Sequence, residues 1–364
     1  MGAARHLSLL RDLGAERVEW PVPFADGLPK LLGFRGRAVV VLASGDPFWF
    51  GAGSVVARHL APGEWRALPG VSSFALAAAR LGWPLERVAC HGLHAAPLAQ
   101  LRAGLAPGAR AIVLLRDGAA VGDLARFLTD AGFGESTLTV MEALGGPRER
   151  IRTTTAEGYT LEDVAHPVCV GVEIAGGGAV LPLAPGRAET WFDHDGQITK
   201  APVRAMTLAA LAPTPGAHLW DIGAGSGSVA IEWLLAGPDL TATALEADET
   251  RAARIAENAS RLGVASRLEG ITGRAPEALA TLTRSPDAVF IGGGLSEALL
   301  TALWACIAPG TRVVANAVTL EGEALLAGLP GGDLMRIEIA RAAPLGAKRG
   351  WKSAYPIVQW SGRR

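Results

Sequence analysis

The stretch LWDIGAGSGSVAIEW, residues 219–233, decides the fold of the second half of this chain. It contains a short apolar strand, a turn with three glycines and the start of a helix, in that order. This succession is typical of the first unit of a nucleotide-binding α/β domain. Such a unit normally opens its domain, yet more than half of the 364 residues come before it. Two questions follow: which ligand the turn holds, and what the preceding residues form.

Three known patterns can be compared with the glycine turn. The dinucleotide pattern GxGxxG, counted from Gly223, finds Gly225 but then Ser228 in place of the third glycine. The phosphate-binding pattern GxxxxGK[ST] requires a lysine that the turn lacks. The methyltransferase pattern, an acid two residues before GxGxG, is met by Asp221, Gly223, Gly225 and Gly227. The turn therefore indicates S-adenosyl-L-methionine (SAM) as cofactor, and an NAD-dependent dehydrogenase is the disfavoured alternative.

The chemistry of SAM suits these residues. SAM has no phosphate, so it does not need the helix N-terminus that binds a pyrophosphate. The glycines let the backbone approach a ligand closely. Asp221 is placed to face the amine, and Glu246, at the end of the next predicted strand, is placed to accept hydrogen bonds from both ribose hydroxyls. The predicted cofactor-binding set of this domain is Asp221, Gly223, Ala224, Gly225, Gly227 and Glu246. The alternative is a turn that serves packing alone.

The length of the chain predicts two domains. In the first part, buried strands alternate with alanine- and leucine-rich helices, and the strands are predicted at 38–43, 109–115, 136–142 and 167–174. A stretch rich in Gly, Pro and Asp, 175–203, interrupts this pattern. From residue 204 onward strands and helices alternate regularly, which predicts a mostly parallel, doubly wound sheet. We expect domains at 1–190 and 191–364.

Composition excludes several classes of protein. A net charge of -1 and a pI of about 6.7 give no indication of nucleic-acid binding. The apolar runs are far shorter than the ~20 residues that span a bilayer, so no membrane association is expected. The three cysteines form no CxxC pair, which predicts a cytoplasmic protein without structural zinc, and no other metal site is predicted.

Longer segments resemble known families. GRAVVVLASGDPFWFGAG (36–53), PGVSSFALAAARLGWP (69–84) and VMEALGGPRERI (140–151) resemble the tetrapyrrole methylase family, whose members bind SAM in a cleft between two small α/β lobes. The glycine turn with its flanks, PDAVFIGGG (286–294) and ARAAPLGAKRGWKSAYPIVQW (340–360), is similar to the second half of the bifunctional, decarboxylating precorrin methyltransferases of cobalamin biosynthesis. The resemblance implies methylation of a precorrin at C5 by the first domain. It implies methylation at C15, with loss of CO2 from the ring C acetate, by the second.

One departure concerns the beginning of the chain. Members of the tetrapyrrole methylase family normally carry a strand and a Gly-rich turn before the segment that matches ARHLSLL, whereas this sequence begins MGAARHL. Two explanations stay open: a start codon assigned too late, which we favour, or a true truncation. In the second case only the C15 methylation and decarboxylation are expected, and the first domain is a scaffold. The resemblance also implies that Asp46, Ser72 and Ser73 contact SAM in the first domain, the alternative being a simple turn.

Two regions are candidates for substrate binding. Gly292 and Gly293 follow a predicted strand and allow a broad macrocycle to lie close to the backbone, unless they form a simple turn. From Ile339 to the C-terminus the chain carries six cations and no Asp or Glu. The family's tetrapyrrole substrate carries many carboxylates, which Arg and Lys bind. The predicted contacts are Lys348, Arg349 and Lys352, and the alternative is a solvated basic tail.

Methyl transfer from a sulfonium requires little acid–base chemistry, so no catalytic triad is expected and no catalytic residue is named. The predicted fold is a tetrapyrrole methylase-like two-lobed domain followed by a Rossmann-like (class I) SAM-dependent methyltransferase domain. Because both component families are typically oligomeric, a homo-oligomer is expected.

Overall fold

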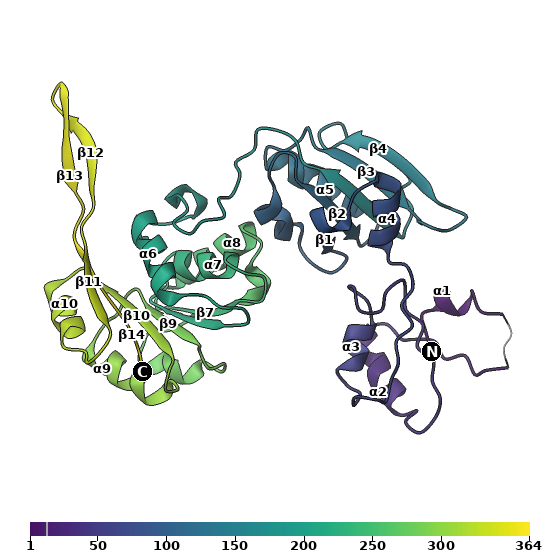
Figure 1. The fold of residues 1–364 in the computed structure, drawn as a ribbon, viewed down its shortest axis with the longest axis horizontal. Helices are drawn as coiled ribbons and strands as arrows, with labels where there is room; N and C mark the ends of the chain where they lie inside the picture. Colours follow the sequence, from purple (N-terminus) through teal and green to yellow (C-terminus); the bar gives the residue numbers. More distant parts are fainter. Residues whose placement is uncertain (12–13) are drawn as a thin grey trace. The chain divides into compact units, whose positions relative to one another are not determined.

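In the computed structural model, residues 1–11 and 14–364 are described. They form two compact units, shown with the whole chain in Figure 1. The first contains residues 1–96 and 106–178, and the second contains 97–105 and 179–364. The boundary expected near residue 190 for the functional domains stays a prediction.

The second unit is built on a seven-stranded sheet with the order β11-β14-β10-β9-β6-β7-β8. Its strands are β6 (His218–Ile222), β7 (Thr241–Glu246), β8 (Leu268–Thr272), β9 (Ala288–Ile291), β10 (Arg312–Ala317), β11 (Asp333–Ile337) and β14 (Ile357–Arg363). The five strands from β10 to β8 are parallel, β14 pairs antiparallel with β10, and β11 pairs antiparallel with β14. The predicted mostly parallel sheet is confirmed. The chain order reverses beside β6, which is where ligands bind in open α/β sheets.

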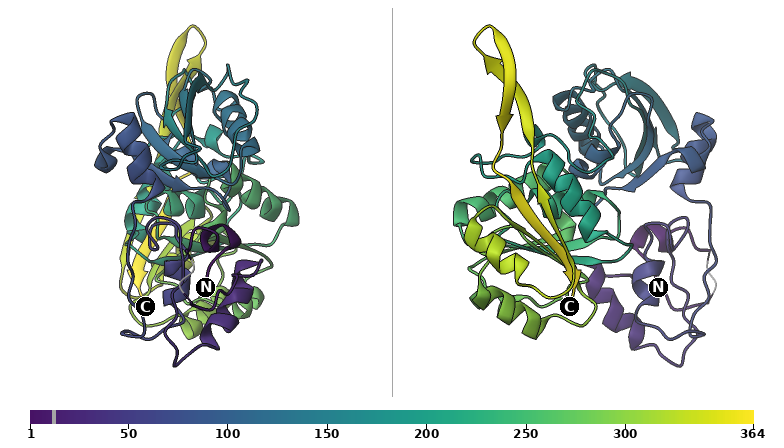
Figure 2. Two further views of the ribbon diagram at one scale, coloured as in Figure 1. Left: turned by 90° about the vertical axis from the view of Figure 1, so that its right-hand side faces the viewer. Right: turned by 60° about the vertical axis from the view of Figure 1, so that its left-hand side comes forward.

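Helices cover both faces of this sheet, as Figure 2 shows from two further sides. They are α6 (Ala201–Leu211), α7 (Ser228–Leu235), α8 (Glu249–Arg261), α9 (Glu297–Cys306) and α10 (Leu320–Ala327). Leu219 and Phe290 belong to the hydrophobic cluster formed with α7 and α8, whereas Trp220 and Val289 belong to the cluster formed with α9. Successive residues of one strand thus serve opposite faces, because side chains alternate along a strand.

A buried ion pair fixes the chain that leads into this sheet. Arg204 of α6 and Glu232 of α7 are fully buried, with Nε and Oε1 2.8 Å apart. The Glu232 carboxylate also accepts hydrogen bonds from the backbone N–H groups of Gly186 (2.6 Å) and Arg187 (2.9 Å). Arg204 donates to the carbonyls of Thr199 and Arg187. These contacts anchor residues 186–187 and 199 against α7.

A two-stranded hairpin follows β11. Its strands, β12 (Ala340–Leu345) and β13 (Lys348–Ser353), extend beyond the main sheet (Figure 1), and within the described part of the chain they pair only with each other. The sequence analysis predicted neither this hairpin nor β11 and β14.

The first unit contains a five-stranded sheet with the order β1-β2-β5-β3-β4. The strands are β1 (Ala89–Gly92), β2 (Arg110–Leu115), β3 (Thr137–Glu142), β4 (Arg150–Thr155) and β5 (Val168–Glu173). Its helices are α1 (Ala4–Leu7), α2 (Gly27–Leu32), α3 (Gly53–Ala57), α4 (Ser73–Leu81) and α5 (Ala119–Asp130). The predicted strands at 109–115, 136–142 and 167–174 are confirmed. Helix α4 ends at Gly82, which adopts φ +67°, a conformation that glycine takes without strain.

The prediction of a strand at 38–43 is wrong. This segment is extended, and its contacts with the chain start are hydrogen bonds from the Met1 amino group to Val40 (2.7 Å) and from Leu42 to Met1 (2.8 Å). Two hydrogen bonds are too few to form a ladder, and Val40 is 72% exposed. The apolar run therefore lacks the neighbouring strand that would make it part of a sheet.

Among the described residues, no helix combines the length and apolar character needed to cross a membrane.

Candidate active site

The glycine turn lies between β6 and α7, at the carboxyl edge of the parallel sheet. Gly223, Gly225 and Gly227 have φ values of +68°, +59° and +75°. Residues with a side chain rarely adopt such angles, so all three positions favour glycine. The sequence pattern thus reflects a backbone requirement of the turn.

Gly223 also packs against a second glycine segment. A Cβ atom on Gly223 would lie 2.7 Å from the backbone nitrogen of Gly293 and 2.8 Å from its Cα. Gly292 donates its N–H to the carbonyl of Ile222 (2.9 Å). The segment after β9 and the turn after β6 therefore lie backbone to backbone. This contact requires a glycine at position 223, whereas a Cβ atom on Gly293 would lie 3.7 Å from the Gly223 carbonyl oxygen, an ordinary contact.

Asp221 lies beneath the turn and not on the cavity wall. Its side chain is fully buried, and Oδ2 accepts a hydrogen bond from the N–H of Ala230 in α7 (3.0 Å). Oδ1 has no hydrogen-bond partner among the described residues. Burial raises the pKa of this carboxyl to about 7, and the nearby Glu246 charge acts in the same direction. The placement fits a group that holds the start of α7 against the turn.

Glu246 connects the end of β7 to the glycine turn. Its Oε2 accepts a hydrogen bond from the N–H of Gly225 (2.7 Å), and Oε1 accepts one from the N–H of Asp248 (3.0 Å). Unlike Asp221, it lines the adjacent cavity. Each oxygen of an ionised carboxylate can accept more than one hydrogen bond, so Glu246 keeps acceptor capacity for a ligand.

The cavity above these residues has a volume of about 1180 Å³. This slightly exceeds the ~300–1,000 Å³ usual for a small-molecule site, so it offers room for a cofactor together with part of a second ligand. Its walls include Gly223, Ala224, Gly225, Glu246, Gly292 and Gly293. Gly227 packs against Ile255 of α8 behind the turn.

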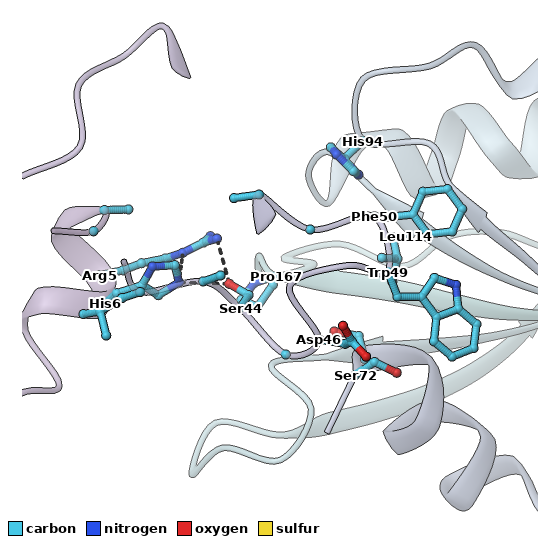
Figure 3. A pocket seen from close by; sticks show the side chains of 18 of the residues that line it. Arg5, His6, Ser44, Asp46, Trp49, Phe50, Ser72, His94, Leu114 and Pro167 are labelled. Atoms are coloured by element: carbon cyan, nitrogen blue, oxygen red, sulfur yellow. Dashed lines mark hydrogen bonds between the residues drawn. The ribbon is translucent and has the colours of Figure 1, made fainter. Parts of the chain in front are cut away.

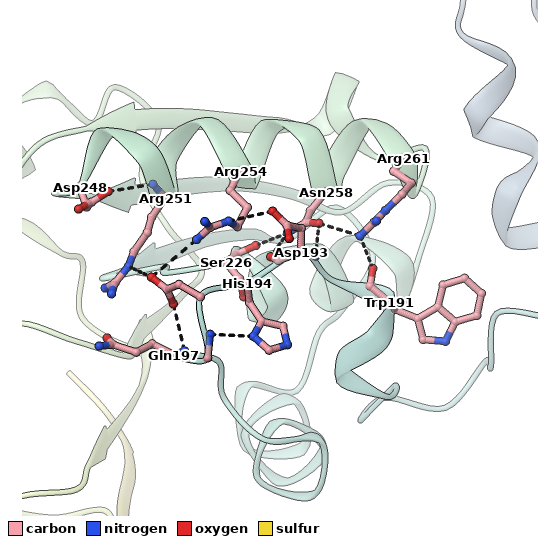
Figure 4. A network of polar contacts seen from close by, with 12 residues as sticks. Trp191, Asp193, His194, Gln197, Ser226, Asp248, Arg251, Arg254, Asn258 and Arg261 are labelled. Atoms are coloured by element: carbon pink, nitrogen blue, oxygen red, sulfur yellow. Dashed lines mark hydrogen bonds and ion pairs between the residues drawn. The ribbon is translucent and has the colours of Figure 1, made fainter.

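Ion pairs hold one wall of this cavity against α8 (Figure 4). Arg251 pairs with Asp195 (Nε to Oδ2, 2.7 Å), and Arg254 pairs with Asp193 (Nε to Oδ2, 2.9 Å). The N–H of Gln197 donates to Oδ1 of Asp195 (3.0 Å). Gln197 and Arg251 both line the cavity, so these contacts fix the segment 193–197 where it enters the cavity wall at Gln197.

Asn258 joins this wall to the glycine turn. Its side chain is buried, and Nδ2 donates to the carbonyls of Asp193 (2.9 Å) and Ser226 (3.0 Å), while Oδ1 accepts from the N–H of Asp193 (2.8 Å). One side chain thus links α8, the segment 193–197 and the turn. The sequence analysis did not single out Asn258, because an asparagine inside an amphipathic helix carries no distinctive pattern.

The three predicted cations of the C-terminal segment lie on the β12–β13 hairpin. Lys352 lines the cavity, and so does Arg341, its partner across the hairpin. Lys348 and Arg349 lie nearer the tip and are exposed. The sequence analysis did not assign Arg341 a contact, since the register that pairs it with Lys352 appears only in the structure.

The first unit has a cavity of its own, of about 730 Å³ (Figure 3). Asp46 and the consecutive residues Ser72 and Ser73, which belong to two separate loops of the sequence, all line it. Asp46 Oδ1 accepts from the N–H of Phe48 (2.8 Å), and Ser72 Oγ caps α4 by accepting from Ala75 (3.1 Å). The structure therefore brings the three predicted residues to one cavity, where two of them also stabilise local turns.

The opposite wall of this cavity carries a polar cluster that the sequence analysis did not name. His6 Nε2 and Ser44 Oγ are 2.9 Å apart, and Arg5 donates to the same hydroxyl (3.3 Å). Burial and the nearby Arg5 charge lower the pKa of His6. These side chains lie on separate short segments, which is why no local motif indicated them.

The second unit therefore has the fold of a class I methyltransferase, with a glycine turn and a strand-end glutamate at the point where such enzymes bind their cofactor. Residues 190–364 match a family model described as the precorrin methyltransferase domain, and residues 31–159 match that of tetrapyrrole (corrin/porphyrin) methylases. A Sinorhizobium protein named precorrin-6Y C(5,15)-methyltransferase [decarboxylating] is 49% identical over 368 residues, covering 99% of this chain and 88% of the relative.

Two further relatives are also named as decarboxylating precorrin methyltransferases. A Mycobacterium tuberculosis protein of the same name is 40% identical over 375 residues, which cover 99% of this chain and 91% of that protein. A Salmonella typhimurium protein named cobalt-precorrin-6B C(15)-methyltransferase (decarboxylating) is 35% identical over 170 residues, covering 44% of this chain and 85% of that protein. The chain belongs to the precorrin-6Y C5,15-methyltransferase (decarboxylating) family. The predicted family, the two-part fold and the class of SAM-dependent methyltransferase are confirmed, and the dehydrogenase alternative is rejected.

Proposed function

We propose that this enzyme methylates precorrin-6Y at C5 and C15 and removes CO2 from the ring C acetate, which gives precorrin-8X. The names of the full-length relatives support the complete reaction. The second unit is assigned the C15 methylation and the decarboxylation, because the shorter relative is named for these steps alone. The first unit is then assigned the methylation at C5.

We propose Gly223, Ala224, Gly225 and Glu246 as the SAM-binding residues of the second unit, with Asp221 and Gly227 supporting the turn from outside the cavity. Two observations support the fit. A Cβ atom on Gly225 would meet only the Gln197 carbonyl, at 3.7 Å, so the backbone is open on the cavity side. Glu246 offers acceptor capacity at the same wall, as the two ribose hydroxyls require.

When bound, SAM supplies a methyl group that its sulfonium has already activated. The contribution of the chain is to hold the cofactor and the macrocycle in line and to exclude water. Such orientation can supply ~7–11 kcal/mol of a reaction barrier. The backbone contact between Gly223 and Gly293 supports this role, because it fixes the cofactor turn relative to the segment that we propose to lie under the substrate.

We propose Asp46, Ser72 and Ser73 as SAM contacts of the first unit. Their common cavity supports this assignment.

A second candidate function, C15 methylation and decarboxylation alone, is favoured by one observation. Residues 1–11 and 14–72 contain a single isolated bridge, Gly2 to Glu19, and no strand of a sheet, so loops and short helices form that side of the cavity.

The test is a product analysis with precorrin-6Y and labelled SAM, combined with calorimetric titration of SAM. The proposed function predicts two methyl groups and one CO2 per substrate, with two SAM sites per chain. One methyl group with CO2 and a single SAM site would favour the second candidate. No methyl transfer by the wild-type enzyme would contradict both. A homo-oligomer and a cytoplasmic location stay predictions of the sequence analysis.

A further inference from the structure

Two cations lie opposite each other at the base of the β12–β13 hairpin. Arg341 and Lys352 are cross-strand partners, and both line the large cavity of the second unit. Like charges that face each other across a hairpin destabilise it. No hydrogen bond or ion pair with a carboxylate compensates either side chain among residues 1–11 and 14–364. The pair therefore costs stability in the free protein, which indicates a function in binding an anion.

The charge of the whole cavity supports this conclusion. Its lining contains one acid, Glu246, and five cations: Lys200, Arg251, Arg274, Arg341 and Lys352. Of these cations, Arg251 is paired with Asp195. SAM carries a sulfonium, an ammonium and a single carboxylate, so it does not need so cationic a wall. The excess of positive charge must therefore serve a second, anionic ligand.

The hairpin register divides its cations between two faces. Arg341, Ala343 and Leu345 lie on one face of β12, because side chains alternate along a strand, and their partners are Lys352, Gly350 and Lys348. Arg341, Ala343 and Lys352 line the cavity, whereas among the described residues of the other face only Ser353, at the base of the hairpin, does so, and we therefore take the first face as the cavity face. Arg349 pairs with Pro344 and therefore lies on the opposite face, together with the largely exposed Trp351.

Apolar side chains line the cavity beside these cations. They are Ile337 at the end of β11, Ile339 just before β12 and Ala343 within β12. An apolar wall with cations at its edge is complementary to a flat conjugated ring whose rim bears carboxylates.

We propose that Arg341 and Lys352 form a carboxylate-binding site that holds an acetate or propionate group of the tetrapyrrole in the second unit. Lys348, on the same face, extends the site toward the hairpin tip, and Arg349 does not take part. This inference rests on the proposed function for the identity of the ring. The guanidinium of Arg341 can bind a carboxylate through two hydrogen bonds, and Lys352 adds a point charge.

The experiment measures binding of precorrin-6Y by its change in absorption, in the absence of SAM, to the full-length wild type and to single variants. Arg341→Ala and Lys352→Ala are each expected to weaken binding about tenfold, the lower end for loss of a charge-assisted hydrogen bond. Arg341→Lys should recover part of the loss. Arg349→Ala removes a charge from the same hairpin and should change the affinity less than twofold. SAM affinity should be unchanged in all variants.

The melting temperature of each variant shows whether a loss of binding results from a loss of folding stability. Because the two cations repel each other, Arg341→Ala should leave the melting temperature of the free enzyme unchanged or slightly higher. Equal losses for Arg349→Ala and Arg341→Ala would overturn the assignment to one face. Unchanged binding in Arg341→Ala and Lys352→Ala, or no binding by the wild type, would overturn the site itself. A wild type that binds precorrin-6Y through these residues but transfers no methyl group would refute the proposed function and leave the site intact.

Discussion

Replacing Gly223 by alanine tests the idea that the cofactor turn and the segment after β9 form one rigid pair. Gly223 has φ +68°, and its added Cβ would lie 2.7–2.8 Å from three backbone atoms of Gly293. Backbone cannot rotate away as a long side chain can, so one of the two segments has to shift. We expect Gly223→Ala to destabilise the second unit and to abolish its SAM binding.

The expected loss of folding stability in Gly223→Ala has two parts. The left-handed conformation costs a residue with a Cβ atom about 1–2 kcal/mol. Forcing an extra carbon into a packed site costs about 1–3 kcal/mol more, which gives about 2–5 kcal/mol in total. For a unit of this size each kcal/mol lowers the melting temperature by roughly 2–4 °C, so a decrease of roughly 4–20 °C is expected.

Scanning calorimetry measures this decrease, and two further variants separate its parts. Gly216→Ala is the matched control: Gly216 has φ +78° and no atom within 4 Å of an added Cβ, so it should show the conformational cost alone. Gly225→Ala, with φ +59° and ordinary contact at 3.7 Å, should resemble Gly216→Ala in stability but lose SAM affinity. If Gly223→Ala were no less stable than Gly216→Ala, the close contact with Gly293 would not exist in solution.

Two other predictions concern the carboxylates near the turn. Glu246→Gln keeps the shape but removes the charge and one acceptor, so SAM affinity should fall about tenfold, the lower end for hydrogen bonds to a charged group; calorimetry that finds the wild-type affinity would exclude Glu246 as a ribose contact. Asp221, whose pKa burial raises to about 7, binds a proton more readily in the folded than in the unfolded chain. Its contribution is therefore fully present below the unfolded pKa near 4 and is lost as the pH rises through 7. Asp221→Asn should accordingly gain stability relative to the wild type as the pH rises from about 4 to about 7 in urea unfolding, and a constant difference over this range would contradict the assignment.

The sequence predicted best where local backbone requirements and periodicity coincide. The three glycines of the predicted turn lie between β6 and α7, where their positive φ values favour glycine, and Glu246 lies at the end of β7 beside them. The strands β6, β7, β9 and β10 are buried along almost their whole length, so they lack the strict alternation of apolar and polar residues that a half-exposed strand shows.

The features that the sequence analysis missed depend on partners distant in the chain. The segment 38–43 has the composition of a strand but lacks a ladder, and composition alone does not reveal a missing neighbour. The hairpin carries Arg, Ala, Lys and Gly in place of a repeating apolar pattern, so the pairing of its two strands could not be predicted from the sequence. Asp221 was expected to face the ligand, and whether a strand-end carboxylate points outward or beneath a turn depends on the helix that follows it.

The short stretch 97–105 has a consequence for how this chain can be divided. It lies in the middle of the first unit's sequence, yet it packs in the second: Arg102 donates to the carbonyl of Ala179 (2.6 Å) and stacks over the Trp191 ring, and Ala99 lies against Gly263 at the end of α8. The backbone therefore passes between the units at three places. A gene cut at residue 179 would leave the seven-stranded sheet complete. A second half expressed in this way would lack residues 97–105 and the packing that they provide. To keep the stability of the second unit, a split or permuted form of the protein would have to retain these nine residues in the same chain as residues 179–364.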